Sequence, residues 1–283
     1  MSSLDPADGR QLEGLLRRHR ITLQHRLGQN FLVDTRLRDA VADAAELGRD
    51  DEVLEVGAGV GTLTIALAAR SRRVVAVEFD RALIAALHEV VAGNANVEIA
   101  QADILRYDVG AAFPRGGEVV AGNIPYNLTG ALIRKLLDES PRPRRLSLVV
   151  QKEVAERWTA TTTASLGTIA VQVYTEPRIV MTVPAASFVP APRVDSALVV
   201  MDVRERPAVD VPDMNGFFRF VEEVFQFRRK QIGGTLARMA GVKGSEAAIR
   251  MDELGIGAQR RPQTLTLREW ERIYGAFNPM PGR

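Results

Sequence analysis

The sequence contains no cysteine and only three histidines, His19, His25 and His88. The absence of cysteine excludes disulfides, thiolate metal ligands and a cysteine nucleophile. Three scattered histidines do not form the cluster of ligands that a metal site needs. We therefore expect no metal centre.

Long apolar runs are also missing. No stretch approaches the roughly 20 apolar residues that cross a bilayer, and the polar start MSSLDPADGR lacks the apolar core of a secretory signal. With 46% hydrophobic residues in 283, the chain can still bury a substantial core. We expect a cytoplasmic protein, a monomer, with no membrane partner.

The net charge is only +2, but basic residues gather in three places. The clusters are Arg17, Arg18 and Arg20; Arg142, Arg144 and Arg145; and Arg228, Arg229 and Lys230. One such cluster is more typical of a solvated surface than of a nucleic-acid contact. Three clusters in one chain leave an RNA or DNA partner open.

Short β-branched runs alternate with helical patterns through the first two thirds of the chain, which is typical of a parallel sheet covered by helices. We expect strands at 52–56, 73–78, 97–102, 118–123, 146–151, 178–183 and 196–203, and helices at 62–70, 81–91 and 131–139. The strand pattern stops around 204–213, and the remainder predicts helices at 215–229, 231–240, 245–254 and 267–276. The expected domains are 1–205, with an N-terminal arm at 1–35, and 206–283.

The segment LEVGAGVGTLT places Gly57, Gly59 and Gly61 between an expected strand and an expected helix. Glycines there let the backbone turn tightly and approach a ligand without a Cβ in the way. An isolated pair would indicate only a turn, whereas three alternating glycines favour a nucleotide-like cofactor. The dinucleotide pattern G-x-G-x-x-G needs glycine or alanine at position 62, and Thr62 disfavours NAD.

Two acids follow the next two expected strands. Glu78 closes the second strand, where a carboxylate can accept hydrogen bonds from ribose hydroxyls, and Asp103 follows the third, where one can accept an adenine amino group. Each acid alone could be an exposed strand cap. Together with the glycine loop they favour a cofactor with ribose and adenine but no pyrophosphate, which describes S-adenosylmethionine.

The segment GNIPYNLTG follows the fourth strand at the same expected sheet edge. An adenine amine is a poor nucleophile, and the amide oxygen of Asn123 with the carbonyl of Ile124 could accept its two N–H bonds. Pro125 would stiffen the backbone, and the ring of Tyr126 could hold the base flat. A polar strand end with a half-buried tyrosine is the plainer alternative, which the glycine loop disfavours.

These residues resemble the ribosomal RNA adenine N6,N6-dimethyltransferases, most of all the branch that acts on the small subunit. The segments that carry the resemblance are LGQNFL (27–32), EVGAGVGTLT (55–64), VEFD (77–80), QADIL (101–105), GNIPYNLTGALI (122–133), FVPAPRVDSALV (188–199), FQFRRKQIGGTLA (225–237) and RPQTLTLREW (261–270). The resemblance implies a Rossmann-like α/β fold: a seven-stranded class I methyltransferase sheet followed by a small all-helical domain. It implies dimethylation of two adjacent adenosines in the 3′-terminal hairpin loop of small-subunit rRNA and a role in ribosome biogenesis.

Several site residues follow from the resemblance by position. It implies S-adenosylmethionine contacts from Asn30, Leu32, Gly57, Glu78, Asp103 and Asn123, to which the loop pattern adds Gly59. It also implies that Tyr126 and Phe188 sandwich the flipped adenine, in agreement with an aromatic in the proline-rich loop SFVPAP. Arg228, Arg229 and Lys230 would contact RNA phosphates from a helix.

Three alternatives remain open from the sequence. The first is the sister branch of the family, which methylates large-subunit rRNA. The second is a ribosome-assembly or nucleic-acid binding factor in which methylation is secondary. The third is a DNA adenine methyltransferase, although such enzymes usually have an acidic residue where Asn123 stands. Two departures from the family pattern concern RNA grip or local packing. Gly234 stands where an asparagine is expected, and QHRLGQNF lacks the usual lysine pair.

Overall fold

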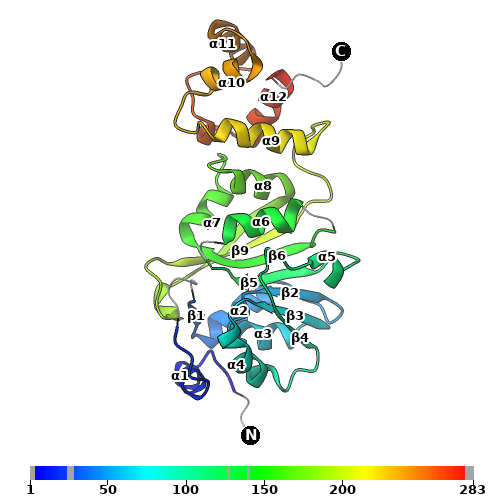
Figure 1. The fold of residues 1–283 in the computed structure, drawn as a ribbon, viewed down its shortest axis with the longest axis vertical. Helices are drawn as coiled ribbons and strands as arrows, with labels where there is room; N and C mark the ends of the chain where they lie inside the picture. The colour runs from blue at the N-terminus through cyan, green and yellow to red at the C-terminus, as the bar shows by residue number, and fades with distance from the viewer. Residues whose placement is uncertain (1–3, 24–28, 126–127, 139–140, 278–283) are drawn as a thin grey trace. The chain divides into compact units, whose positions relative to one another are not determined.

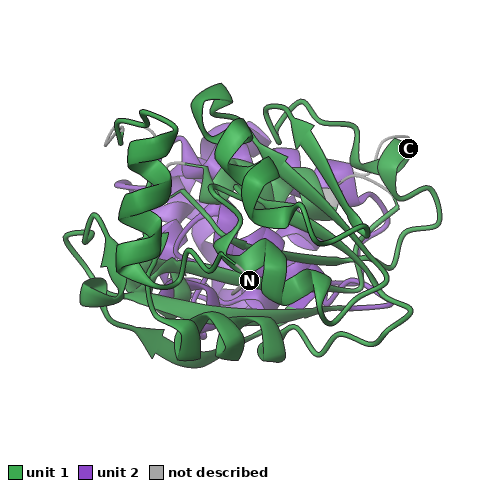
Figure 2. Ribbon diagram, turned by 90° about the horizontal axis from the view of Figure 1, so that it is seen from below, with its two compact units in different colours: residues 1–156, 176–203 green, residues 157–175, 204–283 purple. Residues whose placement is uncertain are grey.

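The computed structural model describes residues 4–23, 29–125, 128–138 and 141–277. The chain divides into two compact units, coloured separately in Figure 2. Unit 1 comprises residues 1–156 and 176–203, and unit 2 comprises 157–175 and 204–283. The segment 157–175, which we placed in the first domain, thus groups with the C-terminal helices. The division falls within helix α7 (Lys152–Thr159).

A mixed sheet of seven strands forms the centre of unit 1, in the order β4-β3-β2-β5-β6-β9-β7 (Figure 1). The strands are β2 (Glu52–Val56), β3 (Arg73–Glu78), β4 (Val97–Gln101), β5 (Val119–Asn123), β6 (Arg145–Gln151), β7 (Thr175–Val183) and β9 (Ser196–Val203). Strands β4, β3, β2, β5 and β6 run parallel, and β9 pairs antiparallel with β6. All seven expected strands are present, and the α/β sheet is confirmed.

The parallel strands are apolar because helices cover them. The connecting helices are α3 (Thr62–Ala68), α4 (Arg81–Val91), α5 (Val109–Ala112) and α6 (Thr129–Asp138). Helix α3 contacts β3, and α4 contacts β3 and β4. Helix α4 begins after Asp80, whose side chain accepts a hydrogen bond from the Ala82 amide and so caps the helix. Asp80 therefore ends the short turn after β3 and caps the start of α4.

The chain before β2 carries more structure than the sequence indicated. It forms helix α1 (Gly9–Arg18), the short strand β1 (Phe31–Leu32) and helix α2 (Thr35–Ala44). Helix α1 buries Leu12 and Leu15 in the unit 1 core. Strand β1 pairs antiparallel with β8 (Phe188–Val189), which follows the 3₁₀ turn at Ala185–Ser187. Both strands have two residues, too short for an alternating pattern to reveal them.

Unit 2 is helical. Its helices are α8 (Leu166–Tyr174), α9 (Met214–Phe225), α10 (Ile232–Ala240), α11 (Gly244–Glu253) and α12 (Leu267–Phe277), with a 3₁₀ turn at Pro262–Thr264. Aromatic rings form much of its core: Phe217 packs edge-to-face on Tyr274, and Phe225 stacks on Trp270. The Trp270 indole N–H donates to the Thr163 hydroxyl at 2.7 Å, which joins 157–175 to the C-terminal helices.

No helix in the described ranges is long and apolar enough to cross a membrane. Within the same ranges, no group of three or more histidine, aspartate or glutamate side chains is placed so that it could hold a metal ion.

Candidate active site

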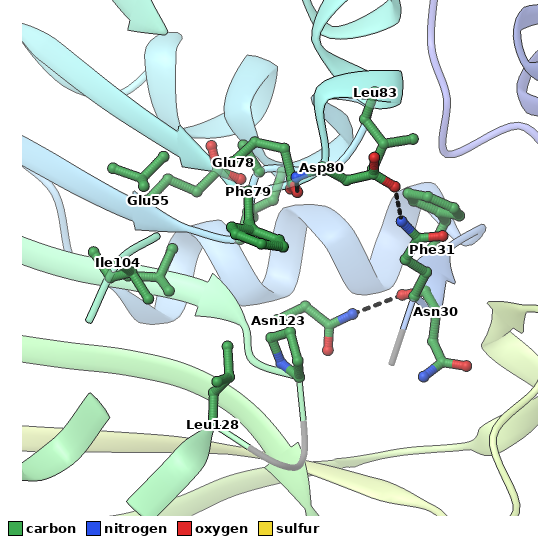
Figure 3. Close-up of a pocket in the computed structure, with 18 of the residues that line it drawn as sticks. Asn30, Phe31, Glu55, Glu78, Phe79, Asp80, Leu83, Ile104, Asn123 and Leu128 are labelled. Carbon is green, nitrogen blue, oxygen red and sulfur yellow. Dashed lines mark hydrogen bonds between the residues drawn. The ribbon is translucent and has the colours of Figure 1, made fainter. Parts of the chain in front are cut away.

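A cavity of about 270 Å³ opens at the carboxyl ends of β2, β3, β4 and β5 in unit 1. The loops after these four strands and the segment leading into β1 form its walls (Figure 3). Open α/β sheets bind ligands at this edge. The predicted residues Asn30, Leu32, Gly57, Gly59, Glu78, Asp103, Asn123 and Pro125 all line it. The fold thus gathers residues that lie nearly 100 positions apart in sequence.

The glycine loop follows β2 directly. Gly57 and Gly59 adopt φ values of +71° and +61°, which side chains with a Cβ rarely adopt. The amides of Gly57 and Ala58 both donate to the Val77 carbonyl, which fastens the loop to the end of β3. A Cβ added to Gly59 would lie 3.0 Å from Cε1 of Phe31. Glycine therefore allows the segment before β1 to approach the loop.

Glu78 stands at the end of β3 and ties two loops together. Its Oε2 accepts the Gly59 amide and its Oε1 accepts the Asp80 amide, each at 2.7 Å. The side chain is buried, and this burial raises its pKa in spite of the backbone donors. Glu78 is therefore held in the cavity wall by hydrogen bonds from both loops.

Asp103 occupies the corresponding place after β4. One carboxyl oxygen accepts the Leu105 amide at 3.0 Å, which fixes the turn. The side chain is 36% exposed, so its other oxygen stays accessible, with only a long 3.9 Å ion pair to Arg106. Asp103 can therefore accept a hydrogen bond from a ligand amino group.

Asn123 ends β5 and contacts the segment before β1. Its Nδ2 donates to the backbone carbonyl of Asn30 at 2.8 Å (Figure 3). Because this bond uses the amide nitrogen, Oδ1 is the atom that can accept a hydrogen bond from a substrate amine. The neighbouring Gln29 donates to Asp80 at 2.6 Å. The segment 29–32 is thus attached at both sides of the cavity.

Ile124 and Pro125 follow Asn123 in the NIPY motif and lead into α6. Ile124 is buried, and its amide donates to the Val149 carbonyl at 3.0 Å. The Pro125 carbonyl accepts the Leu128 amide at 2.9 Å, which fixes the turn into α6. Tyr126 lies outside the described residues. Its predicted stacking role stays a prediction.

Phe188 does not line the cavity. It opens β8, opposite Leu32 of β1, and is 3% exposed within the unit 1 core. Leu32 lines the cavity, so Phe188 lies one strand behind that wall. The described structure does not bring this ring to a base-accepting surface.

The basic clusters differ in their surroundings. Arg144 pairs with Asp51 at 2.8 Å, and Arg145 pairs with Glu46 and Asp202. The predicted helix 215–229 ends at Phe225, so Arg228, Arg229 and Lys230 lie on the following turn rather than on a helix, and all three are exposed. The helix prediction was wrong there because the arginines are good helix formers and nothing in their sequence marks the end.

The lining residues that the sequence analysis did not predict include three of particular interest. Phe79 is 63% exposed, although large aromatics are usually buried, and Figure 3 shows its ring reaching toward the space between Glu78 and Asn123. Ile104 lines the same cavity, next to Asp103. Each follows a predicted acid directly, and that adjacency is the signal that could have found them. The third is Glu55, which lies on β2 two residues before Gly57.

The family model described as ribosomal RNA adenine dimethylase matches residues 20–277. The chain belongs to this family. It is 42% identical over 277 residues to a protein of Pelotomaculum thermopropionicum named ribosomal RNA small subunit methyltransferase A, covering 93% of this chain and 94% of that one. A protein of Shouchella clausii with the same name is 36% identical, covering 96% of each chain.

Two solved structures have a similar fold. The 23S rRNA methyltransferase ErmE superposes with a TM-score of 0.70 at 29% identity, covering 88% of this chain and all of that one. A dimethyladenosine transferase from Plasmodium falciparum gives 0.69 at 23% identity, covering 86% and 95%. The sheet of unit 1 is accordingly the class I methyltransferase fold that the sequence predicted.

Proposed function

We propose that this protein transfers methyl groups from S-adenosylmethionine to N6 of two adjacent adenosines in the 3′-terminal hairpin loop of small-subunit rRNA. The reaction yields N6,N6-dimethyladenosine and belongs to the biogenesis of the small ribosomal subunit. The observation that carries the proposal is the meeting of Asn123, Glu78 and Asp103 at one cavity in a chain of the dimethylase family. The proposed working form is a cytoplasmic monomer.

The side chains of the cavity fit this cofactor. Glu55, Glu78, Asp80 and Asp103 line it, and no lysine, arginine or histidine is among the lining residues that the structure describes. Such a cavity suits a ligand with a net positive charge and opposes a pyrophosphate. The bound cofactor supplies an electrophilic methyl group on a sulfonium. Glu78 would hold its ribose and Asp103 its adenine amine.

Asn123 and its neighbours would hold the target amine. Methyl transfer needs the nitrogen lone pair aimed at the methyl carbon more than it needs acid or base power. Oδ1 of Asn123 and the Ile124 carbonyl would accept the two N–H bonds, and Pro125 would keep the carbonyl in place. Tyr126 would stack on the base. Phe188 would join it only after β1 or β8 shifts, because the ring is buried behind Leu32.

RNA would be held by the exposed basic turn of unit 2. Arg228, Arg229 and Lys230 carry three adjacent positive charges, and no ion pair with a described residue engages them. Backbone phosphates are contacted in this way without sequence discrimination. The choice of adenosine would then depend on the cavity in unit 1.

The test uses small ribosomal subunits that lack the modification. We expect purified protein and methyl-labelled cofactor to place label on adenosine, recovered as N6,N6-dimethyladenosine after digestion. Large subunits and duplex DNA serve as parallel substrates. No label in adenosine from any substrate would refute methyl transfer, and label confined to DNA would move the protein to another class.

A second candidate is methylation of large-subunit rRNA, which the superposition on ErmE favours. The two relatives above, at 42% and 36% identity, carry small-subunit names and are more similar in sequence than ErmE at 29%. Labelling of small and large subunits side by side decides between them. Preference for the large subunit would overturn our choice while leaving the chemistry intact.

A further inference from the structure

Four carboxyl groups line the cavity, and three of them accept hydrogen bonds from the loops around it. Glu78 accepts two backbone amides, Asp80 accepts Gln29 and the Ala82 amide, and Asp103 accepts the Leu105 amide. In Glu55, Oε2 has no partner among the described residues. The fourth carboxyl group therefore has a buried oxygen without a hydrogen-bond donor inside the ligand site.

Glu55 is among the most buried charged residues of the chain. It lies in the middle of the sheet on β2, between β3 and β5, and is 1% exposed. Burial raises the pKa of Glu55 to about 8, against the Thr64 hydroxyl, which lowers it, and with a smaller contribution from the charge of Glu78. Near neutral pH the carboxyl therefore carries a proton, since a buried carboxylate with an unpartnered oxygen is costly.

We propose that Glu55 makes the cavity selective for the charged cofactor over its spent product, by releasing its proton when the sulfonium enters and taking one up when the neutral thioether remains. The inference rests on the proposed function, because it takes S-adenosylmethionine as the cofactor. That ligand and S-adenosylhomocysteine share adenosine, ammonium and carboxylate groups. They differ by a methyl group and the positive charge on sulfur, to which a carboxylate in a low-dielectric site responds strongly.

The proton balance of a turnover is simple. The sulfur–methyl bond breaks, the nitrogen–methyl bond forms, and the nitrogen loses a proton to solvent. Glu55 meanwhile takes one proton from solvent as the sulfonium charge disappears. Once Glu55 is neutral, its electrostatic attraction for the bound ligand is gone. The thioether product therefore dissociates more readily, and the next cofactor replaces it.

The other titratable side chains that line the cavity beside Glu55 are all acids. Glu78 comes from β3, Asp80 from the turn after β3, and Asp103 from the turn after β4. Helix α3 contributes two hydroxyls, Thr62 in the cavity wall and Thr64, which lowers the pKa of Glu55. Burial also raises the pKa of Glu78, so this residue can exchange a proton on binding. Glu78 would face the ribose, which both ligands share. The difference between the two ligands therefore reports on Glu55.

The experiment is isothermal titration calorimetry of the full chain with S-adenosylmethionine and with S-adenosylhomocysteine. Comparing buffers of different ionisation enthalpy counts the protons released. Between about pH 6 and pH 7.5 we expect the cofactor's Kd to fall by up to tenfold per pH unit, with release of about one more proton than for the product.

Two variants accompany the wild type. Glu55→Gln keeps the shape of the uncharged side chain, so it should still fold, lose the extra proton and reduce the preference for cofactor over product by about tenfold. Glu118→Gln is the matched control. Glu118 is 2% exposed, neither of its carboxyl oxygens has a partner in the described chain, and it does not line the cavity. This variant should keep the wild-type preference.

The outcomes separate the two proposals. Binding of both ligands with equal proton release in the wild type would overturn the role of Glu55 alone, without any need for a variant. An unchanged preference in Glu55→Gln would do the same. If neither ligand bound to folded protein, both this inference and the proposed function would be refuted.

Discussion

The side-chain amide of Asn123 donates to the backbone carbonyl of Asn30 at 2.8 Å, across 93 residues of sequence. An amide that donates through Nδ2 presents Oδ1 in the opposite direction. The segment before β1 therefore decides which atom of Asn123 a substrate meets. Orientation of the proposed catalytic amide depends on backbone far from its own motif.

Replacing Asn123 with alanine should lower methyl transfer by about 10²–10³-fold, because the acceptor aimed at the target amine is lost. The change is measured as kcat on unmodified small subunits, with cofactor Kd from calorimetry. Asn96→Ala is the matched control. Asn96 also donates through Nδ2 to backbone carbonyls, of Ala68 and Ser71, but lies outside the cavity. Equal losses in both variants would make Asn123 a structural residue.

Glu118→Gln should stabilise the protein at alkaline pH. Burial raises the pKa of Glu118 from 4.5 to about 7, so the folded state holds a proton that the unfolded chain releases. The wild type consequently loses stability as the pH rises from the unfolded pKa through the folded one. Urea unfolding should show the variant and wild type closely matched near about pH 4.5, and the variant ahead by about 1–3 kcal/mol near pH 8.

The control for that experiment is an acid with the opposite shift. The ion pair with Arg73 lowers the pKa of Glu98, so its contribution is present above the unfolded pKa and lost as the pH falls. Glu98→Gln should therefore lose stability at alkaline pH. If the difference in free energy of unfolding between Glu118→Gln and the wild type did not change with pH, the raised pKa of Glu118 would be contradicted.

Gly234→Ala should stabilise unit 2, because this glycine is exposed within α10 and no atom lies within 4 Å of an added Cβ. Alanine in a helix is favoured over glycine by about 0.5–1 kcal/mol. The adjacent Gly233→Ala should destabilise, since its Cβ would lie 2.8 Å from that of Ala258. Thermal unfolding of both variants tests the pair, and a shift of the same sign in both would count against the packing of α10.

Changing Arg228 and Arg229 to alanine should weaken RNA binding and flatten its salt dependence. Each phosphate contact contributes about 0.9 to the slope of log K against log salt on a duplex, so the slope should fall by about one to two. Fluorescence anisotropy with the hairpin RNA at several salt concentrations measures it. A double alanine variant of Arg17 and Arg18, which pair with Glu13 and Glu89, is the control. An unchanged slope in the first variant would remove the turn after α9 from the RNA contact.

The main strands were predictable because burial on both faces leaves a distinct apolar run, as in Val74 to Val77. Their carboxyl ends then placed Gly57, Glu78, Asp103 and Asn123 together, since parallel strands end at one edge. The prediction that Asn30 and Leu32 belong to the site came only from the family resemblance. The β1–β8 pair that positions them has two residues on each strand and joins positions 156 residues apart in sequence. No local pattern encodes such a pairing.

Burial of single side chains was the least predictable property. Phe79 had no predicted role but is exposed and lines the cavity, whereas Phe188 looked suited to a base and is buried. Glu55 sits in the strand pattern EVLEV as a polar interruption, and only the third dimension shows that it borders a ligand site. Tertiary packing decides these cases, and local sequence carries little of that information.

Helix α1 has a practical consequence for anyone shortening this chain. Asp5 pairs with Arg38 at 2.7 Å, and Arg18 pairs with Glu89, so the first twenty residues hold on to α2 and α4. A truncated version starting near Ile21 would keep every carboxyl group of the cavity but would lose the attachment upstream of Asn30. Affinity tags are best placed before Leu4 or after Phe277. Removing the first twenty residues for crystallisation would remove contacts that support the cavity wall.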